Sequence, residues 1–247
     1  MQGEVKKARE NAILKALEYI GDGMIIGYGT GSTMAQAVNY VRKLVHEEKM
    51  KLYFIPTSFQ SRQLLLENNL PITSLYEYPE PDLMIDSFDQ ADIEGNVIKG
   101  GGGAMLLEKV ITQASRKVIF IGDYMKLVEK LHRPVPLEIL EKAYPHVLKT
   151  LNEIGLKLVL RESSGKMGPL ISDNGNLLGD VDAGSIEDPE KLDRLLRSIA
   201  GVIETGLFPK LADKIIIGMI NGSVKEINID RKKLKNILLN EKISNKS

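Results

Sequence analysis

The chain has 247 residues, of which 43% are hydrophobic, enough for one large domain or for one domain that carries a smaller one. Lysine plus arginine equals aspartate plus glutamate at 33 each, so no overall charge favours nucleic acid or an anionic membrane. The absence of cysteine excludes disulfides, thiolate nucleophiles and cysteine zinc sites, and the three histidines share no metal-ligand spacing, so we expect no metal.

The first predicted element is a helix whose apolar residues recur at spacings of three and four from Val5 to Ile20 and which ends at Gly21 and Gly23. It starts with charged residues instead of an apolar signal core, and no window reaches the ~20 apolar residues that a bilayer span needs. We therefore expect a cytoplasmic protein with no nucleic-acid or membrane partner.

Short apolar runs then predict four strands, with helical patterns between most of them, at residues 24–28, 52–55, 83–86 and 118–123. Strands that alternate with helices at this spacing are typical of a parallel sheet with helices on both faces. The ligand of such a sheet binds at the carboxyl ends of its strands. We expect an α/β fold with a Rossmann-like, mostly parallel sheet.

The pattern changes after Asp123. Two prolines precede a predicted helix at 144–154, and these are followed by a strand at 156–162, a turn at Asn174–Gly175, another strand, a helix at 189–198 and a strand at 202–204. The run 213–227 predicts two strands around a turn. We infer a smaller α+β domain at 133–207, inserted into a Rossmann-like domain formed by 1–132 and 208–247. The tail from residue 230 is expected to be a solvated end, with a short basic helix as the alternative.

The segment GYGTGSTMAQAV, residues 27–38, follows the first predicted strand. Its glycines and the hydroxyls of Thr30, Ser32 and Thr33 suit a phosphate at a helix N-terminus. It lacks the lysine of a Walker loop and the third glycine of a dinucleotide fingerprint. The alternative is a simple turn in which Ser32 or Thr33 caps the helix. In the same way, Thr57 or Ser58 is expected to cap the helix after the second strand.

A second group of polar residues surrounds four consecutive glycines. Asp86 ends the third predicted strand, Asp89 follows in a loop, and Lys99 precedes the glycines. Glu108 lies in the next helix, where Leu106, Leu107, Val110 and Ile111 predict an apolar face that could leave Glu108 exposed. Lys126 follows the fourth strand, where it is either a surface residue or a counter-charge for a phosphate.

These side chains suit one reaction class. A carboxylate can remove a proton next to a carbonyl, while a lysine and backbone N–H groups stabilise the enediolate oxygen. The predicted phosphate-binding loop indicates that the substrate carries a phosphate group. The residues therefore favour isomerisation between an aldose and a ketose phosphate.

The sequence also resembles ribose-5-phosphate isomerase, type A, over residues 4–228. The resemblance rests on the order and spacing of several motifs, among them GYGTGSTMAQAV, PTSFQSRQLLLE, DSFDQAD, IKGGGGAMLLEKV, GDYMKLVEKL and SDNGNLLGDVD. It implies interconversion of ribose 5-phosphate and ribulose 5-phosphate without a cofactor, by a homodimer or homotetramer whose small-molecule partner is the phosphosugar.

The resemblance also implies roles for individual residues. Glu108 matches the base that moves the proton, and Asp86, Asp89 and Lys99 match the groups that open the sugar ring and stabilise the intermediate. The substrate-binding residues that it implies are Thr30, Gly31, Ser32, Thr33, Ser87, Phe88, Gly100, Gly101, Gly102 and Lys126. A basic residue of the first helix often joins the phosphate site, and Lys6, Lys7 and Arg9 all remain possible.

The chain departs from the family pattern at three positions. Ser87 replaces a glycine and Gln90 a glutamate in the aspartate loop, and Met125 replaces a serine. A positive φ at residue 87 would strain the loop by about 1 kcal/mol or more. None of the three is a proton-transfer residue, so we expect activity.

Two other functions fit the sequence less well. A non-catalytic sugar-phosphate regulator could lose its base, but this chain keeps Glu108 and shows no DNA-binding segment. An amino-sugar-phosphate deaminase of similar architecture would be expected to bring a histidine into the cleft, and no histidine lies near these loops in the sequence.

Overall fold

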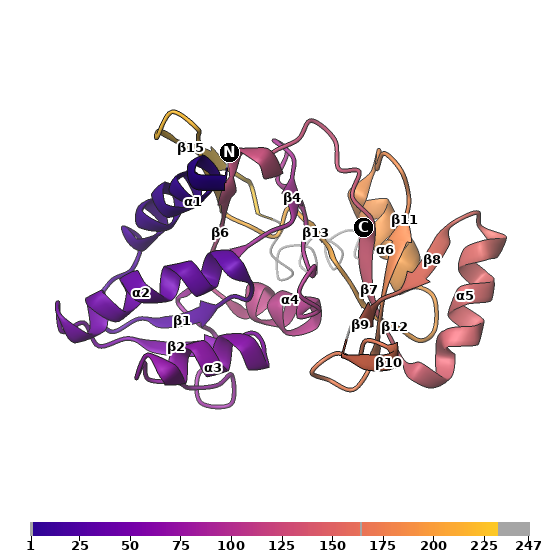
Figure 1. Ribbon diagram of the computed structural model, residues 1–247, viewed down its shortest axis with the longest axis horizontal. Coiled ribbons are helices and arrows are strands. Elements are labelled where there is room, and N and C mark those ends of the chain that lie inside the picture. Colours follow the sequence, from indigo (N-terminus) through magenta and orange to yellow (C-terminus); the bar gives the residue numbers. More distant parts are fainter. Residues whose placement is uncertain (1, 164, 232–247) are drawn as a thin grey trace, which may run out of the picture.

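The computed structural model describes residues 2–163 and 165–231 and is built around a large and a small sheet that lie side by side (Figure 1). The predicted tail beyond residue 231 lies outside the described residues. No helix within the described ranges is long and apolar enough to cross a bilayer.

The large sheet has six strands in the order β15-β14-β6-β3-β1-β2. Five of them are parallel, and β15 runs antiparallel to β14. Their bounds are β1 Ile25–Tyr28, β2 Tyr53–Pro56, β3 Leu83–Ser87, β6 Lys117–Asp123, β14 Lys214–Gly218 and β15 Val224–Asn228. The structure thus confirms the Rossmann-like, mostly parallel sheet, whose central strands are buried on both faces.

Helices cover both faces of this sheet. Helix α1 (Gln2–Leu17) and helix α2 (Ser32–His46) pack on one face through buried residues such as Ala12, Met34 and Val38. Helix α4 (Met105–Ala114) packs on the opposite face through Met105 and Ile111. Helix α3 (Phe59–Glu67) follows the edge strand β2. Alternate side chains of each strand therefore enter two separate cores.

The small sheet is antiparallel, in the order β12-β7-β11-β8. Its elements are β7 Val135–Ile139, β8 Lys157–Leu160, β11 Leu177–Asp182, β12 Val202–Thr205, helix α5 Tyr144–Glu153 and helix α6 Pro189–Arg197. Both helices match their predicted positions and pack on the sheet through residues such as Val147 and Leu196. A hairpin of β9 (Glu162–Ser163) and β10 (Lys166–Pro169) lies between β8 and β11.

Strand β7 is not predicted from the sequence, because Pro134 and Pro136 argue against a strand in the interior of a sheet. Pro136 nevertheless lies opposite Asp180 in this central strand, and its carbonyl accepts a hydrogen bond from the Gly206 N–H at 2.7 Å. A three-stranded sheet is also missed, because its strands are only two or three residues long: β4 Gln90–Ala91, β5 Asn96–Ile98 and β13 Leu207–Pro209.

The strands of the small sheet lie within the range predicted for the inserted domain. The domain boundaries at 132/133 and 207/208 stay a prediction. The position of α4 matters for the site, because Figure 1 shows this helix between the large sheet and the small one.

Candidate active site

A cavity of about 270 Å³ opens where the strands of the large sheet end. It is lined by the loop after β1, the end of β3, the glycine loop, α4 and the short helix η1 (Tyr124–Lys126). The lining residues are Thr30, Gly31, Ser32, Ser87, Phe88, Asp89, Lys99, Gly100, Gly101, Gly102, Glu108 and Lys126. Twelve of the fourteen residues predicted for the site thus share one cavity; Asp86 and Thr33 do not line it.

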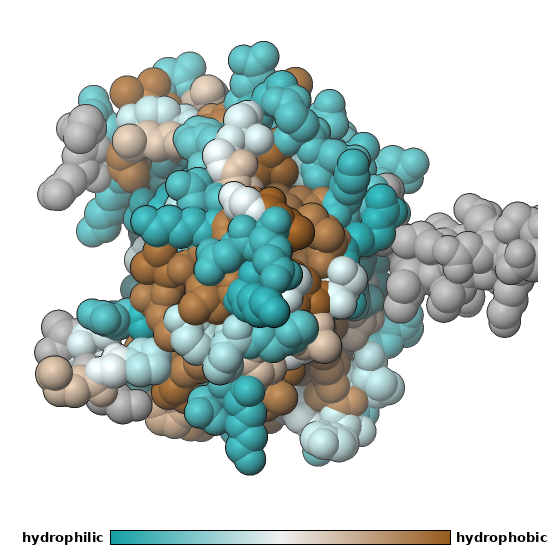
Figure 2. Space-filling view, turned by 90° about the vertical axis from the view of Figure 1, so that its right-hand side faces the viewer, coloured by the Kyte–Doolittle hydropathy of each residue, from teal (hydrophilic) through white to brown (hydrophobic). Residues whose placement is uncertain are grey.

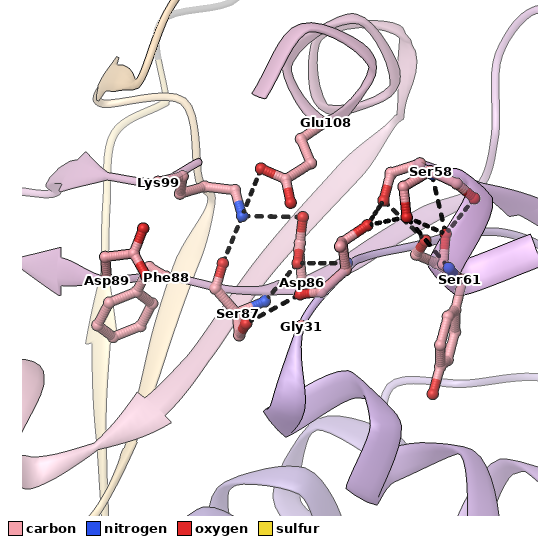
Figure 3. Close-up of polar contacts among 12 residues, drawn as sticks. Gly31, Ser58, Ser61, Asp86, Ser87, Phe88, Asp89, Lys99 and Glu108 are labelled. Carbon is pink, nitrogen blue, oxygen red and sulfur yellow. Dashed lines mark hydrogen bonds and ion pairs between the residues drawn. The ribbon is translucent and has the colours of Figure 1, made fainter. Parts of the chain in front are cut away.

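Two charged side chains, Lys99 and Glu108, line the floor of the cavity, and a third, Asp86, contacts Lys99 without lining the cavity. The Lys99 ammonium lies 2.9 Å from an Asp86 oxygen and 3.2 Å from a Glu108 oxygen. It also donates a hydrogen bond to the carbonyl of Ser87. Figure 3 shows these three acceptors around the lysine nitrogen. Lys99 is 2% exposed, Asp86 0% and Glu108 4%, so water screens these charges little.

Burial and charge set the protonation of the carboxylates. Burial, reinforced by the charge of Asp86, raises the pKa of Glu108 to about 8 even though Lys99 opposes the shift. Burial also raises the pKa of Asp86. Burial alone would lower the pKa of Lys99, but the nearby carboxylates of Asp86 and Glu108 outweigh it and raise the pKa. Lys99 therefore remains an ammonium while Glu108 can hold or release a proton near neutral pH.

The backbone around Asp86 explains its complete burial. Its Oδ1 accepts hydrogen bonds from the N–H groups of Ser87 at 2.6 Å and Thr30 at 3.2 Å. A Cβ at residue 29 would lie 1.9 Å from the same oxygen, so Gly29 alone permits this contact. Strain is expected at Ser87 only if its φ is positive. Ser87 is not among the described residues with positive φ, so this strain is absent.

The glycine loop needs its glycines for different reasons. Gly100 (φ 94°) and Gly103 (φ 76°) adopt left-handed backbone conformations. The Gly101 N–H donates to Asp89 at 2.7 Å, and a Cβ at Gly101 would lie 2.9 Å from both oxygens of that carboxylate. At Gly102 the nearest atom to such a Cβ would be 3.7 Å away, so only this glycine could take a methyl group without strain.

Arg161, which directly follows β8, supports this loop. The sequence does not predict this role. Its guanidinium donates to the carbonyls of Gly100 at 2.8 Å and Gly101 at 3.2 Å. Asp180 holds the same guanidinium through two hydrogen bonds of 2.7 Å. Since Arg161 lies sixty residues from the loop in the sequence, no local pattern connects the two.

The phosphate-type loop ends at the N-terminus of α2. Gly31 (φ 104°) is the N-cap, and no side chain among the described residues caps the helix, so the alternative that Ser32 or Thr33 caps it is wrong. Thr33 is buried, and its hydroxyl has no hydrogen-bond partner within the described residues. The first N–H groups of a helix lack partners within that helix. This helix end therefore offers donors to an anion.

The N-terminus of the next helix, α3, is capped by Ser58, one of the two residues expected there. Ser58 is the N-cap of α3 and accepts from the Ser61 N–H at 3.1 Å. The hydroxyl of Thr30 bonds to those of Thr57 at 2.7 Å and Ser58 at 2.6 Å. Figure 3 shows this chain of hydroxyls leading from Ser58 towards Asp86. Thr30 is thus held in place by α3.

One basic residue, Lys126, lines the cavity, and a second, Arg9, lies close enough for its charge to act on Lys126. Lys126 donates to the carbonyl of Phe88, and burial lowers its pKa. Lys126 is therefore partly buried and lines the cavity. Among the basic residues considered in α1, Arg9 forms an ion pair with Asp123 at 2.8 Å, whereas Lys6 and Lys7 are exposed. Of these three, the structure thus brings Arg9 towards Lys126 without making it a lining residue of the cavity.

The predicted apolar face of α4 is partly wrong. Leu106 and Leu107 are only partly buried and Val110 is 40% exposed, whereas Glu108 and Lys109 are buried. The spacing rule fails because it assigns charges to the solvent, while the partners that bury these two come from distant segments.

The departure at Gln90 also has a structural role. Its side-chain oxygen accepts from the N–H groups of His132 at 2.8 Å and Arg133 at 3.1 Å, and its amide contacts the His132 ring at 3.1 Å. Gln90 therefore holds the segment that leads to the small sheet. Its amide does not line the cavity.

Comparison with known proteins gives a consistent result. Residues 53–222 match the sequence model of the family described as ribose 5-phosphate isomerase A (phosphoriboisomerase A). A ribose-5-phosphate isomerase A from Archaeoglobus fulgidus is 47% identical over 211 residues, which are 84% of this chain and 93% of the relative. One from Methanococcus aeolicus is 41% identical, over 85% of this chain and 90% of the relative.

Solved structures agree. Ribose 5-phosphate isomerase A from Methanocaldococcus jannaschii superposes with a TM-score of 0.86 at 34% identity, covering 90% of this chain and 99% of that one. A D-ribose-5-phosphate isomerase solved in complex with phospho-erythronic acid gives a TM-score of 0.87 at 35% identity, covering 91% of this chain and 99% of the other.

Proposed function

The chain belongs to the ribose 5-phosphate isomerase A family, and we propose that it interconverts D-ribose 5-phosphate and D-ribulose 5-phosphate. The observation that carries this function is the buried pair of Lys99 and Glu108, which lines a cavity of about 270 Å³ and is backed by Asp86 in contact with Lys99. The chain is an enzyme, an aldose-ketose isomerase. A non-catalytic regulator is not favoured, since the relatives are isomerases, and Glu108, the proposed base, lines the cavity.

Glu108 is the proposed base. As a carboxylate it removes the proton from C2 of the open-chain aldose, and the resulting carboxylic acid returns that proton to C1, while the hydroxyl proton of O2 moves to O1. A pKa of about 8 keeps this group close to balance between its two forms at neutral pH. It lies at the cavity wall, where one oxygen contacts Lys99.

Lys99 is proposed to stabilise the intermediate. When the C2–H bond breaks, negative charge develops on the carbonyl oxygen at C1, and an ammonium in a buried setting stabilises that charge strongly. Asp86 touches Lys99 from below the cavity floor and acts through it. The glycine loop is proposed to leave the Gly102 N–H accessible to a sugar oxygen, because the N–H groups of Gly101 and Gly103 already donate to Asp89 and to the Gly100 carbonyl.

Ring opening is assigned to Asp89. Its carboxylate lies at the cavity wall and accepts only the Gly101 N–H among the contacts described. It can exchange a proton with the anomeric hydroxyl and the ring oxygen, which must gain a proton when the ring opens. We propose Ser87 and Phe88, which also line the cavity, as contacts of the sugar chain.

The phosphate group is proposed to bind at the other end of the cavity. Gly31, Ser32 and Thr33 present the N-terminus of α2, and the unpartnered Thr33 hydroxyl can join when the loop adjusts. Lys126 supplies a positive charge at the same rim. No cofactor takes part in the proposed reaction.

We also propose that the enzyme is cytoplasmic and assembles as a homodimer or homotetramer. Figure 2 shows the side of the molecule that carries the small sheet, where hydrophobic residues gather at the centre between hydrophilic ones. Exposed apolar side chains near β8 and α5 include Val159 at 53%, Leu140 at 46% and Ile154 at 46%. Apolar patches of this kind are typical of contacts between subunits.

The test uses purified, chelator-treated protein with ribose 5-phosphate and follows ketose formation. The parent should isomerise the sugar without added metal, and Glu108→Gln should lose at least about 10²-fold in kcat. Glu153→Gln, at an exposed position of α5, is the matched control and should retain parent activity. Equal turnover by parent and Glu108→Gln would refute the assignment of the base.

A further inference from the structure

Glu108 has a buried charged neighbour that the proposed reaction does not use. Lys109, 2% exposed, follows it directly on α4 and points to the small sheet. The Lys109 ammonium lies 2.7 Å from Glu204 of β12 and 3.4 Å from Asp193 of α6. It also lies 3.4 Å from the hydroxyl of Thr205. Lys109 therefore links α4 to strand β12 of the small sheet and to helix α6, which packs on that sheet.

Its partners are themselves held in place. The Thr205 hydroxyl donates to Asp193, and the Thr205 N–H donates to Glu204 at 2.8 Å. Arg197 adds weaker ion pairs to the two carboxylates, at 3.8 and 3.7 Å. Two cations thus balance two anions. Because Arg197 is about half exposed while Lys109 is buried, Lys109 provides most of the neutralisation within this cluster.

A buried ion pair is weak evidence for stability, since its desolvation offsets much of its attraction. What such a pair does provide is a defined orientation. Glu108 and Lys109 are consecutive on one helix, so their side chains project about 100° apart and any rotation of α4 moves both. Fixing Lys109 between Glu204 and Asp193 therefore fixes the direction in which Glu108 points.

A second link runs through Phe208. Its ring centroid lies 4.9 Å from the Lys109 nitrogen and 5.6 Å from the Lys99 nitrogen. The backbone just before Phe208 is bonded to the site as well, since the Lys99 N–H donates to the Gly206 carbonyl at 2.8 Å. The segment that carries Glu204 and Phe208 thus contacts both lysines.

We infer that Lys109 is a positioning residue, which locks α4 against β12 and α6 so that the Glu108 carboxylate is held against Lys99. This inference rests on the proposed function of Glu108. It assigns Lys109 no contact with the substrate, because Lys109 does not line the cavity.

The test is Lys109→Met, which keeps most of the length of the side chain and removes its charge. We expect kcat to fall at least about tenfold with KM within about twofold, and the acid limb of the pH profile of kcat/KM to move, because Glu108 no longer has a fixed distance to Lys99. The double variant Lys109→Met/Glu204→Gln removes the unpaired charge as well. It should melt at a higher temperature than the single variant while its kcat stays low.

The matched control is Val147→Ala, a cavity in the small core away from α4. A purely structural role would lower the melting temperature in the Lys109 variants as in this control and leave the pH limb unchanged. The inference is overturned if either folded Lys109 variant has the kcat of the parent and the same acid limb in its pH profile. A crystal structure of the double variant that keeps the 3.2 Å contact between Lys99 and Glu108 overturns it too. Inactivity of the parent protein would refute the proposed function instead, and the crystallographic test would still stand.

Discussion

The pH dependence of the reaction tests the electrostatics of the site most directly. Burial and the charge of Asp86 raise the pKa of Glu108 from 4.5 to about 8. A general base must be ionised in the free enzyme, so kcat/KM should fall as the pH drops below the pKa of Glu108. The perturbation is Asp86→Asn, which removes the neighbouring negative charge and leaves Glu108 with Lys99.

The magnitude follows from the pKa. With a value of about 8, roughly 1% of Glu108 is ionised at pH 6, so kcat/KM there should be about 100-fold below its plateau. With an ordinary value of 4.5, more than about 95% would be ionised at pH 6 and the profile would be almost flat. Because the charge of Asp86 raises this pKa, Asp86→Asn should move the acid limb to lower pH.

The assay is initial ketose formation between about pH 5.5 and 9.5 at constant ionic strength. Glu153→Gln serves as the control and should reproduce the parent profile. The second ionisation of a phosphate ester, near pH 6, affects every variant alike and so cancels in the comparison. A parent profile that is flat between pH 6 and 9, or a limb that moves to higher pH in Asp86→Asn, would show that the electrostatic reasoning is wrong.

Three further predictions concern the glycine loop. Gly100→Ala would put a Cβ at φ 94° and 2.9 Å from the Met105 Cβ, so thermal melting should show a loss of stability of about 1–3 kcal/mol. Gly102→Ala meets nothing closer than 3.7 Å and should keep the melting temperature but raise KM; unchanged KM would mean that the sugar does not approach this backbone. Arg161→Met removes the donors to the Gly100 and Gly101 carbonyls and should lower kcat/KM about tenfold or more, with Lys149→Met on exposed α5 as the control; parent-like kcat/KM would show that the loop holds its shape without Arg161.

Local patterns were sufficient for the elements with regular spacing. The parallel strands of the large sheet, α5, α6 and the cap at Ser58 follow from apolar runs and capping residues within a few positions of each other. The sheets formed by β9–β10 and by β4, β5 and β13, as well as strand β7, do not follow from local patterns. Their strands are very short or, in β7, contain prolines, and so carry no clear local signal.

The site follows the same division. Thr30, Asp89, Lys99 and Glu108 could be chosen from the sequence because each sits next to a strand end or a glycine loop, and parallel strands bring their carboxyl ends to one edge. The sequence could not predict the burial of Glu108, the support of the glycine loop by Arg161 or the buried face of α4. These features depend on side chains from segments that lie far away in the chain, and only the packed tertiary structure brings such groups close enough to exclude water and shift a pKa.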